Sequence, residues 1–180
     1  MTALKKRNRV FGICIYGVPI LLLKNIVAMK SFPSLTELTL QSYDESAPVL
    51  PDSFLGGTAR RLRSFYLQGI SFLGLGKLLV STTNLVRLSL FDIPHSGHIS
   101  PEATVANLSM STKHDVLTLI FGSPRSRAVR ENRKSPPLIR DVLPALYYLH
   151  FRGDSEYLEG FVAGVDVPLL RGIDISSSIN

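Results

Sequence analysis

The apolar residues of this chain recur in a short pattern, apolar-x-x-apolar-x-apolar, whose second half alternates as in a half-buried strand. The copy Leu85-Val-Arg-Leu88-Ser-Leu90 shows it clearly. Copies begin at residues 10, 35, 62, 85, 114, 146 and 170, so they lie 23 to 32 residues apart. In the copy that begins at His114, a histidine stands where the other copies have an apolar residue. The pattern therefore predicts about seven short strands at irregular spacing.

Helix-like stretches lie between these strands, at residues 72–80, 101–110 and 154–162. Ser100 and Asp154 are expected to cap two of the helices, and Pro101 stands at a first helical position, where proline is tolerated. A spacing near 20–29 residues is typical of leucine-rich repeats. We therefore expect an α/β solenoid (horseshoe) of that type, in which short parallel strands alternate with helices. It should cover residues 10–180 after a basic tail at 1–9, and the lack of closing units indicates truncation at both ends.

Neighbouring side chains of a strand point to opposite faces, which divides the pattern into two sets of positions. The first, fourth and sixth residues are expected in the core, and the second, third, fifth and seventh on the concave face. Because Tyr and Arg are favoured anchors in interfaces, we expect a protein-binding surface there. Its candidate residues are Glu37, Tyr66, Gln68, Arg87, Phe91, Tyr148, His150 and Arg152. The alternative is that these are ordinary solvated residues, with Phe91 partly covered by a loop.

The composition excludes several classes of protein but does not indicate a specific activity. The chain has 180 residues, 45% of them hydrophobic, which fits one folded domain. Cys14 is the single cysteine, so no disulfide can form within the chain, and a cytoplasmic or nuclear location is expected. The sequence contains neither a Gly-x-Ser-x-Gly nucleophile motif nor a phosphate-binding loop. We expect no enzyme activity, cofactor, metal site or small-molecule substrate.

The net charge of +6 is concentrated in two segments rather than spread over the chain. One is the basic tail and the other is residues 125–134, within a Pro- and Ser-flanked stretch at 124–137. Without them, 11 of the 20 basic and 13 of the 14 acidic residues remain, which leaves a nearly neutral body. The stretch 124–137 has no aromatic residue on which a base could stack. We expect a solvated loop insertion there, and nucleic-acid association remains a weaker alternative.

The apolar segment at residues 10–23 allows a second alternative. Basic residues precede it as in a secretory signal, and its 14 residues fall short of the ~20 that a membrane-spanning helix needs. Gly12, Gly17 and Pro19 interrupt it, and its first part alternates like a strand. We expect a strand of the repeat. The alternative is a membrane-associated or exported repeat protein.

Three segments of the chain resemble the leucine-rich-repeat regions of fungal F-box-like proteins. They are Phe32-Pro-Ser-Leu-Thr-Glu-Leu-Thr-Leu40, Arg61-Leu-Arg-Ser-Phe-Tyr-Leu-Gln-Gly-Ile70 and Thr82-Thr-Asn-Leu-Val-Arg-Leu-Ser-Leu90. The resemblance implies a ubiquitin-ligase subunit whose repeats bind an unknown target protein. An adaptor of the ligase would be a further partner only if an F-box exists upstream, because nine residues before Val10 cannot form one.

The chain departs from that family at the turns that follow its strands. Tyr43, Ile70 and Ile93 stand where the family usually has Asn or Cys. A hydrogen-bonded Asn ladder cannot form with these residues. We therefore expect apolar packing to hold the turns instead.

Overall fold

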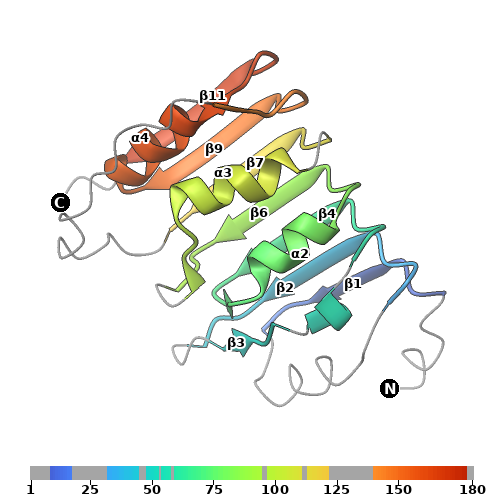
Figure 1. The fold of residues 1–180 in the computed structure, drawn as a ribbon. Helices are drawn as coiled ribbons and strands as arrows, with labels where there is room; N and C mark the ends of the chain where they lie inside the picture. Colours follow the sequence, from blue (N-terminus) through green and yellow to red (C-terminus); the bar gives the residue numbers. More distant parts are fainter. Residues whose placement is uncertain are drawn as a thin grey trace.

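The computed structural model describes residues 9–17, 32–44, 48–52, 54–57, 59–94, 97–110, 113–121 and 140–177. Seven strands form one open sheet whose spatial order follows the order along the chain (Figure 1). Every pairing within this sheet is parallel. The strands are β1 (Gly12–Ile15), β2 (Glu37–Gln41), β4 (Ser64–Gln68), β6 (Arg87–Phe91), β7 (Val116–Ile120), β9 (Tyr148–Gly153) and β11 (Gly172–Ser177). The predicted α/β class with parallel strands is confirmed.

The pattern copies lie in register across the whole sheet. The fourth residue of each copy pairs with the fourth residue of the next, as Phe65 does with Leu88 and Leu88 with Leu117. Phe65, Leu88 and Leu117 are almost fully buried, and so are Leu40, Leu67 and Phe151 at the sixth position. Leucine and phenylalanine recur at these positions because each one packs on its counterpart in the neighbouring strand.

Three α-helices occur among the described residues, and all three lie on the same side of the sheet (Figure 1). They are α2 (Leu75–Ser81), α3 (Pro101–Ser109) and α4 (Ser155–Gly164). Ser100 caps α3 by accepting a hydrogen bond from the Ala103 N–H (3.2 Å), and Asp154 caps α4 by accepting one from the Glu156 N–H (2.8 Å). Both predicted caps are therefore confirmed, as is Pro101 at the first position of α3.

Short parallel pairs add a second set of strands outside the main sheet. One pair joins β3 (Val49–Leu50) to β5 (Ser71–Phe72), and the other joins β8 (Asp141–Val142) to β10 (Val165–Asp166). The 3-10 helix η3 (Phe54–Gly57) follows β3. Helix α2 begins at Leu75, a little after the predicted start at residue 72, because Ser71 and Phe72 belong to β5.

Two predictions about the core are wrong. Ile173 and Ile175 hold core positions of the pattern, yet they are 54% and 46% exposed. Strand β11 pairs only with β9, and no described helix follows it, so no described element covers these side chains from beyond the edge. Tyr43 is 70% exposed and does not hold its turn by apolar packing, whereas Ile70 and Ile93 are buried as expected.

The turn after β4 depends on a glycine. Gly69 has φ +64°, and a Cβ there would collide with the Ser42 carbonyl oxygen. This close approach lets neighbouring turns hydrogen bond: the Ser42 N–H donates to the Gln68 carbonyl (3.0 Å) and the Gly69 N–H to the Phe91 carbonyl (3.0 Å). Asp92, the equivalent residue after β6, also has a positive φ, +47°.

Several predicted features lie outside the described residues. These are most of the basic tail, the later part of the apolar segment at residues 10–23, and the basic stretch at 124–137. Within the described part of that apolar segment, residues 12–15 form β1, as predicted. In the part of the chain that the structure describes, no helix has the length and apolarity to cross a membrane.

Candidate functional site

The sheet has two unlike faces, because alternate residues of each strand point to opposite sides. Leu88, Leu90 and Leu119 line a small cavity together with residues of the three helices, so this face packs on the helix layer. The opposite face, here called the open face, carries the third, fifth and seventh positions of the pattern. Among the described residues, no helix packs on it.

All eight residues predicted for the binding surface lie on the open face, in rows that cross the strands. Glu37, Arg87 and Tyr148 belong to the row at the strands' amino ends. Tyr66 and His150 belong to the middle row, and Gln68, Phe91 and Arg152 to the row at the carboxyl ends. These residues therefore share one face of the sheet, and their role in binding stays a prediction.

Two of these residues form an aromatic pair across neighbouring strands. The rings of Tyr66 on β4 and Phe91 on β6 stack with their centroids 5.0 Å apart and their planes 25° apart. Cross-strand aromatic pairs of this kind stabilise a sheet and give it a firm apolar surface. Phe91 is half-buried, and the Tyr66 ring of the same face stacks against it.

Amide side chains hold the phenol of Tyr66 in place. Its hydroxyl donates to Gln68 Oε1 (2.7 Å), and Gln41 Nε2 donates to the same oxygen. Gln68 Nε2 in turn donates to the Asp92 carboxylate (3.4 Å). The chain of contacts links β2, β4 and the turn after β6, so the carboxyl ends of three strands form one polar and aromatic surface.

Sequence reasoning missed two further aromatic residues of this surface. Tyr16 follows β1 directly and is 66% exposed, and Tyr43 follows β2. Burial raises the pKa of the Tyr66 hydroxyl above its usual value; the amide of Gln41 lowers it, and Tyr43, Asp92 and Tyr16 add to the rise. Tyr16 and Tyr43 follow β1 and β2, at the edge of the sheet where β4 also ends. Tyr16 stands at a seventh pattern position, so the pattern could have placed it on the open face. Tyr43 lies beyond the pattern, which therefore says nothing about it.

The C-terminal half of the open face is a separate group of side chains. His150 Nε2 lies 3.6 Å from an Asp174 carboxylate oxygen, and the Tyr148 ring lies against Gly172. Strand β7 separates this group from β6 and presents Val116, Thr118 and Ile120 between them. The eight predicted residues therefore form two groups of side chains on the open face, one on each side of β7.

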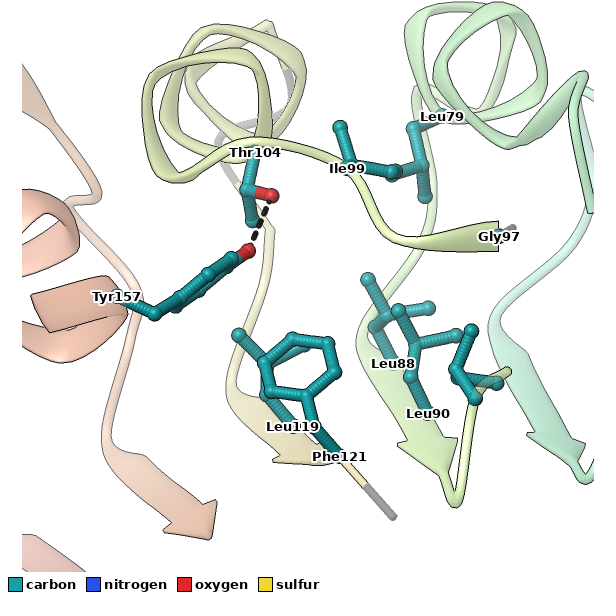
Figure 2. A pocket seen from close by; sticks show the side chains of 10 residues that line it. Leu79, Leu88, Leu90, Gly97, Ile99, Thr104, Leu119, Phe121 and Tyr157 are labelled. Carbon is teal, nitrogen blue, oxygen red and sulfur yellow. Dashed lines mark hydrogen bonds between the residues drawn. The ribbon is translucent and has the colours of Figure 1, made fainter. Parts of the chain in front are cut away.

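The cavity on the helix side has the character of a packing defect. It is lined by ten residues, nearly all apolar, and within it Thr104 of α3 hydrogen bonds to the Tyr157 hydroxyl of α4 (2.8 Å; Figure 2). The cavity volume is about 10 Å³, which leaves room for about one water molecule. Small-molecule sites are typically 300–1,000 Å³, so this cavity does not hold a substrate.

The described residues offer no arrangement for metal chemistry. No three His, Cys, Asp or Glu side chains gather as metal ligands within the described ranges. His98 packs against Phe121, with ring centroids 4.7 Å apart, and its Nε2 lies 2.8 Å from the Ile93 carbonyl oxygen. This histidine therefore links the loop before α3 to the sheet.

Comparison with known proteins gives no assignment. No family model, no curated protein and no solved structure matches this chain. Its function must therefore be inferred from the open face and the sequence pattern.

Proposed function

We propose that this chain is a non-enzymatic protein-interaction module, a leucine-rich-repeat-like solenoid that binds a target protein through the open face of its sheet. Three observations support the proposal: the repeat spacing, the register of the copies across the sheet, and a sheet face that no described helix covers. The resemblance to fungal F-box-like proteins extends it, since the target would then be a substrate for ubiquitination.

The observation that carries the proposal is the stacked pair of Tyr66 and Phe91 with its ordered amide neighbours on the open face. Aromatic side chains that the fold already holds lose little conformational freedom when a partner docks on them, so they suit an interface. On the opposite side of the sheet, the described helices occupy the place where a partner would have to dock.

The test is to replace Tyr66 and Arg87 by alanine and measure affinity for a partner isolated with the unaltered chain. We expect each substitution to weaken binding about tenfold, the effect of removing an interface anchor. Val162→Ala, on the exposed surface of α4, is the matched control and should leave affinity unchanged. If both open-face variants fold normally and bind as tightly as the unaltered chain, the open face is not the interface.

A further inference from the structure

The carboxyl ends of the first strands bring aromatic rings and carboxylates together. Parallel strands all end at the same edge of a sheet, so residues that follow them become neighbours. Here those residues include an aromatic cluster, defined as Tyr16, Tyr43, Tyr66 and Phe91, and the exposed carboxylates of Asp44 and Asp92.

The cluster presents ring surface to the solvent rather than to the core. Tyr16 and Tyr43 are the most exposed of its rings, while Tyr66 and Phe91 cover one another by stacking. The face of an aromatic ring is electrically negative and attracts a cation that lies within about 6 Å of its centre. Exposed tyrosines beside carboxylates therefore favour a cationic group over an anionic or purely apolar one.

The Asp92 carboxylate is exposed, and the side chain that it contacts does not neutralise its charge. It accepts from the uncharged amide of Gln68, whereas Asp174 at the other end of the open face lies beside His150. Arg87 is the first residue of β6 and Phe91 is the last, so the backbone of Arg87 lies roughly 13 Å along the strand from the cluster.

We propose that the aromatic cluster with Asp92 is a recognition site for an arginine or lysine side chain in an extended segment of a partner protein. This inference rests on the proposed function, because it names the chemistry of the partner at that face. A cation placed there would meet aromatic rings and the Asp92 carboxylate, in a protein whose net charge would otherwise repel it.

Matched fluorescent peptides that differ only in carrying Arg, Lys, Glu or Leu test the inference by anisotropy with the full chain. We expect the Arg and Lys peptides to bind at least about tenfold more tightly than the Glu peptide, and added salt to weaken them. Tyr43→Ala and Asp92→Asn should each weaken the Arg peptide about fivefold. Asparagine tolerates positive φ, so Asp92→Asn keeps the turn.

Tyr147→Ala and Asp141→Asn, which remove an exposed ring and an exposed carboxylate elsewhere, are the controls and should bind like the unaltered chain. The inference is overturned if Arg and Glu peptides bind alike, or if the controls lose as much affinity as the cluster variants. A Leu peptide that binds best and depends on Tyr66 would overturn the inference while supporting the proposed function. If no peptide binds, this inference is overturned but the proposed function is not. The proposed function is tested separately, by the affinity of the Tyr66 and Arg87 variants for an isolated partner.

Discussion

At the scale of single residues, His114 is the clearest conflict between local chemistry and the fold. It occupies a core position that leucine holds in five of the other copies, and it is 3% exposed. Within the described part of the chain, neither ring nitrogen has a hydrogen-bond partner. Burial lowers the pKa of His114 from its usual 6.5 to about 4, because the charged ring would lose its hydration.

This shift predicts a pH-dependent stability with a defined sign. The unfolded chain binds the His114 proton below pH 6.5, whereas the folded chain resists it until about pH 4. The free energy of unfolding should therefore be highest above pH 6.5 and fall by about 3 kcal/mol as the pH drops to about 4. Urea unfolding at a series of pH values measures this fall.

His114→Leu isolates the contribution, since it replaces a buried polar ring by the residue that the pattern favours. We expect it to raise the free energy of unfolding at pH 7 by about 1–2 kcal/mol and to flatten the pH dependence. His150→Gln changes a histidine of the open face and should leave the pH dependence in place. An identical pH profile for His114→Leu and the unaltered chain would show that His114 is not responsible.

At the scale of elements, the turns after the strands determine how closely neighbouring copies pack. Gly69 lies at positive φ directly against the Ser42 carbonyl oxygen, whereas Gly17 lies at φ +60° and a Cβ added to it would meet nothing within 4 Å. The two glycines share the same backbone requirement, and only Gly69 adds a close approach. A comparison of alanine substitutions at the two positions therefore separates the cost of backbone strain from the cost of steric collision.

We expect Gly17→Ala to lower the free energy of unfolding by about 1 kcal/mol, the strain of a left-handed alanine. Gly69→Ala should lower it by about 3 kcal/mol, because the added carbon also displaces the turn after β2. Thermal or urea unfolding of both variants measures the difference. Equal losses would mean that the two turns do not depend on the close approach at Gly69.

At the scale of the whole molecule, the sequence predicts the parallel sheet because each strand repeats one apolar pattern. Leu38, Phe65, Leu88, Leu117 and Leu149 follow from that pattern alone, and all are buried. Ile173 and Ile175 fit the pattern equally well but are exposed, because burial at an edge depends on what lies next to the strand. A pattern within one strand contains no information about its neighbour.

The sequence predicts which residues share a row of the open face, but it does not predict which side chains gather into clusters. Strand alternation places Tyr66 and Phe91 on one face, and their diagonal register allows contact. Tyr43 follows β2 in a turn whose path depends on Gly69 and Ser42, which no periodicity describes. The grouping of Tyr16 and Tyr43 with Asp92 therefore required the three-dimensional structure.

The most direct test of binding through the open face is photo-crosslinking in the native cell extract. A benzophenone side chain replaces Phe91 on the open face or Val162 on the exposed surface of α4, and the adducts are compared. We expect a discrete protein adduct from position 91 that Tyr66→Ala suppresses, and none from position 162. An adduct from position 162 with none from position 91 would contradict binding through the open face.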